Sequence, residues 1–297
     1  MRWMARRARS TSQRVRVLVV LALIAAAFAS VPLISANTGA SANTGASAGT
    51  GAAPITDRLS GPAAARLPAT SRTGQAFGGV AAVGALFTMT AGQLGSHFCT
   101  ASVVHSAHGD LAVTAAHCVT GDSGQMVFVP GYASGQEPYG TWAVAATYTD
   151  QAWQSAQDPD DDVAFLRLSD SSDGVPVEDV TGAERLAAGV SAPALVRVIG
   201  YPNGADQPVS CVNWAKSFSP TQLEFDCDGY TDGTSGGPFL AAAPAGPGGG
   251  SGASSGYGTV VGVIGGYEQG GDTPAVSYAA AFGPAVTALY QNAEAGG

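Results

Sequence analysis

The sequence predicts an all-β domain that ends in one α-helix. Charged residues make up only 12% of the 297 positions, while 41 glycines and 17 prolines supply many turn formers. That balance argues against a coiled coil or a helical bundle, which would be rich in charged and helix-forming residues. Short apolar runs, mostly with a period of two, are bounded by turn residues along the chain, which is typical of a sandwich or a barrel.

The expected strands are nine such runs, in chain order 84–90, 111–114, 126–129, 142–148, 163–168, 194–199, 222–225, 259–264 and 276–281. A further strand-like run at 238–240 precedes a Gly-, Ala- and Ser-rich stretch at 241–258, which we interpret as a long surface loop within the domain. The expected helix begins at Pro284, which suits a first helical turn. Val286, Leu289 and Tyr290 then follow at helical spacing.

The amino terminus predicts an export signal. Six of the 13 basic residues precede position 17, and an apolar run at 17–34 follows, interrupted only by Ser30 and Pro32. The run reaches the lower limit for a membrane-spanning helix, so an uncleaved anchor is the alternative. Pro32 and the small residues near 36 favour cleavage. We therefore expect residues 1–36 to be a signal peptide, the mature protein to be secreted, and no stable membrane association to remain after cleavage.

The rest of the chain divides into a low-complexity segment at 37–75 and a folded domain at 76–297. The first segment opens with two copies of Ala-Asn-Thr-Gly-Ala-Ser and is typical of a linker or a pro-segment. Beyond position 36 the chain carries 7 basic and 22 acidic residues, a net charge of −15. So acidic a chain has no electrostatic means of holding phosphate backbones, which excludes nucleic acid as an expected partner.

Four cysteines in an exported chain predict two disulfides; they are Cys99, Cys118, Cys211 and Cys227. Three pairings are possible, of which the local one closes two short loops in separate halves of the chain. A zinc site is the alternative, because His97 and His117 lie close to the first two cysteines. The adjacent positions of His117 and Cys118 do not match usual zinc-ligand spacing, and export favours oxidation, so we expect no metal.

A histidine and a serine are the candidates for catalysis. His117 follows an apolar strand and two alanines, next to a cysteine, so its imidazole is held in place as a general base must be. Ser235 lies between glycines that let the backbone approach a substrate carbonyl, and the Gly233 and Ser235 amides can point at one oxyanion. No histidine follows the serine, which excludes the Gly-x-Ser-x-Gly elbow of α/β-hydrolases.

A carboxylate is expected to orient the histidine. Four aspartates lie within 158–162, and three of them fit a solvated acidic loop. Asp162 directly precedes an apolar strand and is therefore the best placed to be buried and to accept a hydrogen bond from the His117 ring. Calcium binding is the alternative for this cluster, but the glycine and glutamate of an EF-hand loop are missing at the required spacing.

Three sequence blocks resemble the signatures of chymotrypsin/trypsin-like serine peptidases, in a secreted bacterial form. They are Thr-Ala-Ala-His-Cys at 114–118, Asp-Val-Ala-Phe-Leu-Arg-Leu at 162–168 and Gly-Thr-Ser-Gly-Gly-Pro at 233–238. They occur in that family's order, and the resemblance covers about 76–292. It implies two six-stranded antiparallel β-barrels with the active site between them and a closing C-terminal α-helix.

The resemblance also implies the roles of individual residues. The catalytic residues would be His117, Asp162 and Ser235, with Gly233 and Ser235 as the oxyanion hole. A Cys99–Cys118 disulfide would enclose the histidine, and the strand at 260–267 would line the specificity pocket through Gly265, Gly266 and Tyr267. Such an enzyme needs no cofactor, acts on proteins or peptides, and is expected to be a monomer. A catalytically silent binding module and a surface-tethered protein are the alternatives.

The chain departs from the family at two informative positions. Gly229 replaces the aspartate with which trypsins bind Arg or Lys, so cleavage after basic residues does not carry over. Thr234 replaces the aspartate that forms a buried ion pair with a new amino terminus in the digestive members. An unpartnered buried ammonium is unfavourable, so that activation switch cannot operate here. We expect a permanently formed site and activity from any start between about 36 and 77.

Overall fold

The computed structural model describes residues 72–119, 126–241 and 258–296. The chain divides into the units Met1–Ala64 and Ala65–Gly297, and every described residue belongs to the second. The expected signal peptide, almost all of the expected linker and most of the expected loop at 241–258 lie outside the described residues. Within them, no helix is long and apolar enough to cross a membrane.

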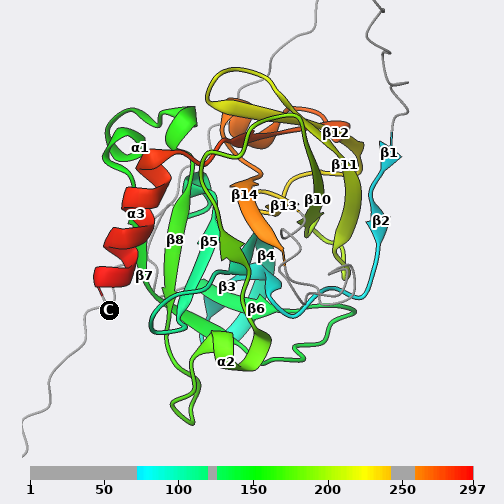
Figure 1. Ribbon diagram of the computed structural model, residues 1–297. Helices are drawn as coiled ribbons and strands as arrows, with labels where there is room; N and C mark the ends of the chain where they lie inside the picture. Colours follow the sequence, from blue (N-terminus) through cyan, green and yellow to red (C-terminus); the bar gives the residue numbers. More distant parts are fainter. Residues whose placement is uncertain (1–71, 120–125, 242–257, 297) are drawn as a thin grey trace, which may run out of the picture. The chain divides into compact units, whose positions relative to one another are not determined.

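The first half of the described unit is a closed six-stranded barrel (Figure 1). Its strands, in spatial order, are β3 (Val83–Thr90), β4 (Gln93–Val103), β5 (Leu111–Thr114), β8 (Ala164–Leu168), β7 (Trp142–Thr149) and β6 (Met126–Pro130). Side chains alternate between the two faces of each barrel strand. The side chains on one face pack together in one core cluster, which includes Leu86, Phe128 and Leu166. The other set, including Val83 and Phe165, joins a second cluster that also holds residues of the second half.

The second half is a nine-stranded sheet in the described residues. Its main path is β1 (Arg72–Thr73), β12 (Gln222–Asp228), β11 (Val209–Ser217), β10 (Ala194–Gly200), β13 (Pro238–Ala241), β14 (Thr259–Val263) and β9 (Arg185–Leu186); β15 (Val276–Ala280) pairs with β12, and β2 (Gln75–Ala76) pairs with β11. One isolated bridge, between Ile264 and Ala279, joins the end of β14 to β15. The structure therefore shows one closed barrel and a sheet, where the sequence led us to expect two closed barrels.

The first described residues form part of this sheet. Arg72 and Thr73 pair in parallel with β12, and Gln75 and Ala76 pair in antiparallel with β11. Between the two short strands, the amide of Gly74 donates to the carbonyl of Asp228 at 2.7 Å. The expected domain boundary at residue 76 therefore falls on the last residue of β2, and three paired residues lie before it.

The described residues also form three α-helices and three 3-10 turns, of which all but the last helix lie between strands. The helices are α1 (Gln151–Ala156), α2 (Val177–Thr181) and α3 (Pro284–Ala295), and the turns are η1 (Ala116–Val119), η3 (Pro159–Asp161) and η4 (Tyr267–Gly270). Helix α3 lies along β7 and β8 (Figure 1) and buries Val286, Leu289 and Ala293. The Arg167 guanidinium of β8 donates to the carbonyl of Ala293 at 2.7 Å, which ties the last turn of the helix to the barrel.

A buried carboxylate lies where the two halves meet. Glu184 forms a parallel bridge with Val104, its side chain is fully buried, and its Oε2 accepts from the amide of Gly258. Its Oε1 has no hydrogen-bond partner among the described residues. Burial raises the pKa of Glu184 to about 7, although the Gly258 hydrogen bond and the charge of Arg197 act in the opposite direction.

Candidate active site

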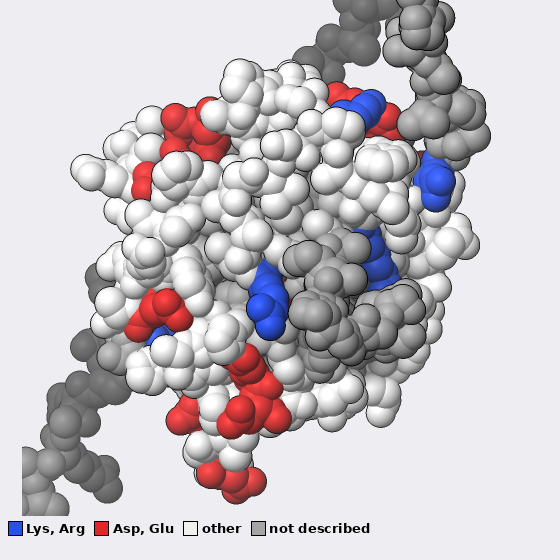
Figure 2. All heavy atoms as spheres, in the orientation of Figure 1, with Lys and Arg blue, Asp and Glu red and all other residues white. Residues whose placement is uncertain are grey.

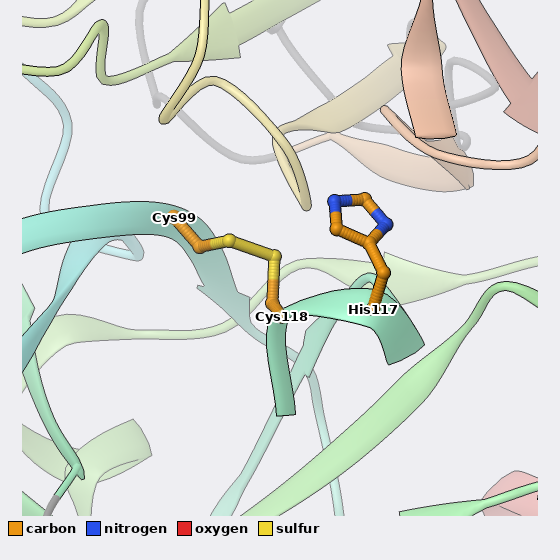
Figure 3. A group of neighbouring side chains, drawn as sticks. All are labelled: Cys99, His117 and Cys118. Atoms are coloured by element: carbon orange, nitrogen blue, oxygen red, sulfur yellow. A yellow bond between two sulfur atoms is a disulfide. The ribbon is translucent and has the colours of Figure 1, made fainter. Parts of the chain in front are cut away.

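A disulfide and a 3-10 turn position the imidazole of His117. Cys118, the next residue in η1, is joined to Cys99 of β4, and the disulfide lies beside the histidine side chain (Figure 3). A second disulfide joins Cys211 of β11 to Cys227 of β12. Of the three possible pairings of the four cysteines, the structure therefore has the local one. The covalent link fixes the turn to the barrel and restricts the backbone that carries His117.

Asp162 is the partner of His117. Its Oδ2 lies 2.8 Å from Nδ1 of the ring, and its Oδ1 accepts from the backbone amide of His117 at 2.9 Å. The amide of Gly266 donates to the same Oδ2 at 2.8 Å. Asp162 has no exposed surface, and a buried carboxylate is tolerated only with such donors. The structure thus brings together the histidine and the aspartate predicted from the sequence.

The remaining aspartates of the acidic segment have structural partners. Asp158 caps η3 by accepting from the amide of Asp160, and Asp160 accepts from the side-chain amide of Gln222 at 2.7 Å. Burial and the neighbouring acidic groups raise the pKa of Asp161. This agrees with the interpretation of these three residues as a loop and of Asp162 as the residue turned inward.

The other histidines lie in different surroundings. His97 packs against the rings of Phe87 and Tyr132, and its Nε2 lies 3.0 Å from the carbonyl of Ala205. His105 pairs with Glu178 through Nδ1 at 2.6 Å.

Ser235 lies in the loop between β12 and β13, where the backbone takes conformations that favour glycine. Gly233 has a φ of +91° and Gly236 a φ of +79°. A Cβ atom on Gly236 would lie 2.2 Å from the carbonyl of Thr100, so a larger residue would displace β4. The carbonyl of Ser235 accepts from the amide of Thr100 at 2.7 Å, which fixes the loop to the first barrel.

A cleft of about 1190 Å³ opens between the barrel and the sheet. His117 and Ser235 both line it, as does Gly233, so the candidate nucleophile, base and oxyanion hole face one space. The carboxylates among the lining residues are Asp232, Glu268 and Asp272, and a neutral polar set is formed by Asn203, Thr231, Thr234, Thr273 and Ser277.

The three predicted substrate-binding residues do not line this cleft. Gly265 donates to the carbonyl of Tyr278, and the amide of Gly266 is used by Asp162. The ring of Tyr267 packs against those of Phe218 and Tyr278. The segment instead reaches the cleft through Ile264 and through residues 268–274. The path of this turn depends on positive φ angles at Glu268 and Gln269, which their residue types do not signal.

The zinc alternative can be tested on the same residues. The sulfur atoms of Cys99 and Cys118 and a ring nitrogen of His117 all lie within 4.8 Å of one another. The two sulfur atoms form a disulfide, however, so neither cysteine supplies the thiolate that zinc requires.

Three contributions to the site went unrecognised in the sequence. Thr100 and Asn203 contact the loop that carries Ser235, and Gly266 provides the third donor to Asp162. Two of these contacts are made by backbone amides, whose positions depend on the fold and leave no mark on residue type. The threonine is one of several in the chain, so only its place beside Cys99 could have singled it out.

A family model and solved structures match this chain. A model of the trypsin-like peptidase domain matches residues 95–263, more than half of the chain. The protease Anisep from Arthrobacter nicotinovorans is 24% identical, with a TM-score of 0.60 over 75% of this chain and 100% of its own. The thermostable serine protease AL20 from an extremophilic microorganism is also 24% identical, with a TM-score of 0.60 over 73% and 98%.

A Glu endopeptidase is 13% identical, with a TM-score of 0.57 over 75% of this chain and 97% of its own. No match is found among curated proteins. At these identities the solved structures establish a shared fold, mostly β with few helices.

Proposed function

Because the chain belongs to the trypsin-like peptidase family, we propose that it is a secreted serine endopeptidase acting through His117, Asp162 and Ser235. The observation that carries this proposal is the pair formed by Asp162 and His117, which opens onto the same cleft as Ser235. A base oriented by a buried carboxylate, with a serine facing the same space, is the arrangement required for nucleophilic catalysis.

Each residue has a defined step in the proposed reaction. The Oγ of Ser235 attacks the scissile carbonyl, while Nε2 of His117 takes the hydroxyl proton. The tetrahedral intermediate then collapses, the C–N bond breaks, and His117 passes the proton to the leaving amine. A water molecule, activated by the same histidine, attacks the acyl-enzyme, releases the acid and restores the hydroxyl. Throughout, Asp162 holds the ring with Nδ1–H toward it and stabilises the imidazolium.

The developing negative charge would be bound by the amides of Gly233 and Ser235. Both residues line the cleft, and glycine at 233 allows the positive φ that this turn requires. No cofactor enters this mechanism, since the protein groups supply the nucleophile, the base and the oxyanion donors.

The proposed substrates are proteins or peptides outside the cell. The expected signal peptide and the two disulfides support secretion. Acidic side chains gather near α1 and near α2 on the face shown in Figure 2, where basic groups are few, which supports the exclusion of nucleic acid. We further propose a monomer in which the nine-stranded sheet serves as the family's second barrel, supported by the Ile264–Ala279 bridge.

Labelling with a fluorophosphonate probe tests the proposal. The secreted protein should react at one residue, and peptide mapping should locate the label on Ser235. Ser235→Ala should lose the label and the hydrolysis of casein, while Ser155→Ala, a matched change of an exposed serine, should keep both. A folded wild-type protein without label would contradict the proposal and leave the silent binding module as the function.

A further inference from the structure

We propose that Thr100 is the positioning residue that holds the oxyanion hole in its binding orientation. This inference rests on the proposed peptidase function and concerns a residue that does not line the cleft. Thr100 lies in β4 directly after Cys99 and has no exposed surface. A hydroxyl buried so completely is costly unless it is hydrogen-bonded, so its partners show what it holds in place.

The hydroxyl of Thr100 joins two separate segments of the second half. Its Oγ1 donates to the carbonyl of Gly233 at 3.0 Å and accepts from the amide of Tyr201 at 2.9 Å. The backbone of the same residue adds a third bond, from its amide to the carbonyl of Ser235 at 2.7 Å. Thr100 therefore fixes the carbonyls of both residues whose amides form the proposed oxyanion hole.

The segment after Tyr201 adds a further hydrogen bond to these contacts of Thr100. We call the whole set of contacts the frame of the oxyanion hole. The amide of Asn203 donates to the carbonyl of Asp232 at 2.7 Å. In a planar trans peptide the N–H points away from the preceding C=O, so this bond turns the amide of Gly233 away from Asn203. Rotating the Asp232–Gly233 peptide would break the hydrogen bond from Asn203. It would also place the carbonyl of Asp232 where the N–H of Gly233 now points.

The frame takes the place of the missing ion pair. The Oγ1 of Thr234 donates to the carbonyl of Thr231 at 2.7 Å and closes the turn before the serine. A Cβ atom on Gly200 would lie 2.7 Å from Cβ of Thr234, so the 200–203 segment packs directly against that turn. The loop is thus held by neutral hydrogen bonds to the barrel and to the sheet, and no new amino terminus is required to order it.

Replacement of the hydroxyl by a methyl group tests the proposal. Thr100→Val keeps the shape of the side chain but can neither donate to Gly233 nor accept from Tyr201. We expect kcat on a peptide substrate to fall by about 100-fold with little change in KM, because the lost groups support the transition state. A peptide aldehyde inhibitor should bind more weakly by a similar factor. Thr100→Ser, which keeps the oxygen, should restore kcat to within a few-fold of wild type.

Controls separate positioning from folding. Thr259→Val changes a buried threonine of β14 and should leave kcat unchanged. Hydrogen exchange at the amide of Tyr201 should accelerate in Thr100→Val and stay slow in Thr100→Ser, whether or not the enzyme is active. If Thr100→Val does not fold, Thr100→Ala carries the same test, since it lacks the same oxygen.

Two results would overturn the proposal: a folded Thr100→Val with wild-type kcat, or a Thr100→Ser as impaired as the valine variant. A wild-type protein without fluorophosphonate labelling would instead contradict the proposed function itself.

Discussion

Asp162 binds His117 at two points, through the ring at 2.8 Å and through the backbone amide at 2.9 Å. Since each carboxylate oxygen takes one of these donors, the ring cannot rotate about its side-chain bonds without losing the Oδ2 contact. The peptide of residue 117 is fixed in turn by Oδ1 and by the neighbouring disulfide. The ring is therefore held in one position, with Nδ1 directed at Asp162, by groups of the protein itself.

Removal of the nucleophile or the base is expected to abolish catalysis. Ser235→Ala and His117→Ala should each lower kcat/KM on peptide amides by about 10⁴-fold or more, because the two groups act as a unit. His108→Ala, a change at an exposed histidine, should retain wild-type rates. Near wild-type activity in either triad variant, measured after contaminating proteases have been removed, would show that the assignment is wrong.

Asp162→Asn tests the orienting role without removing volume. An asparagine can present its NH₂ group to Nδ1 and so favour the tautomer that cannot accept the serine proton. We expect kcat to fall by about 10⁴-fold. The change also weakens the acceptor for the Gly266 amide, so the melting temperature should be measured beside the rate. A variant that stays folded and loses less than tenfold would rule out Asp162 as the orienting group.

Glu184 is expected to make stability depend on pH. Its pKa of about 7 in the folded protein lies above the ordinary value of 4.5, so the folded state binds more protons between these two values. The free energy of unfolding should therefore fall as pH rises from 4.5 to 7, by at most ~3 kcal/mol, and then level off.

Denaturant titrations at several pH values check the effect of Glu184. Glu184→Gln should remove this part of the pH dependence, whereas Glu137→Gln, at an exposed position, should not. Arg197, the charged neighbour of Glu184, is unchanged in Glu184→Gln. A difference between wild type and this variant in how the free energy of unfolding varies with pH therefore reports on the carboxyl group. Parallel curves for wild type and Glu184→Gln would show that the carboxyl titrates normally.

The start of the mature chain is expected to matter only once β1 is reached. Chains that begin between about 37 and 71 should have equal rates on casein, since Thr234 offers no charge to a new amino terminus. A chain that begins at Phe77 lacks β1 and β2, with the Gly74 bond to Asp228, and should be less stable. The structure thus narrows the range of start positions that we expect to give full activity. Activity restricted to one start site, and lost when its amino group is blocked, would contradict this prediction.

The sequence revealed elements whose residues alternate cleanly. The nine expected strands and the strand-like run at 238–240 correspond to observed strands, because apolar residues recur along them at alternate positions or in short runs. β4 and β11 went unrecognised because residues such as Gly95, Ser96, Asn213 and Lys216 interrupt the alternation, although hydrogen bonding to neighbouring strands keeps both extended.

The candidate site, like the strands, could be predicted in part from the sequence. His117, Asp162 and Ser235 carry distinctive chemistry in distinctive local sequence, so residue type and sequence context together singled them out. Gly265, Gly266 and Tyr267 were assigned to the cleft, which they do not line, because the direction of a turn depends on backbone angles and on neighbours distant in sequence.

The pairing of the first described residues has a consequence for the order of folding. The strands of the closed barrel all come from one continuous stretch, 83–168. Arg72, by contrast, bonds to Val212, 140 positions later, and Thr73 pairs with Asp228. Contacts between such distant positions carry a large loop-closure entropy and form slowly. The barrel can assemble while the chain is still being synthesised, but the sheet can form only after its last strands are available and must then pair with residues 72–76, which precede the barrel in the sequence.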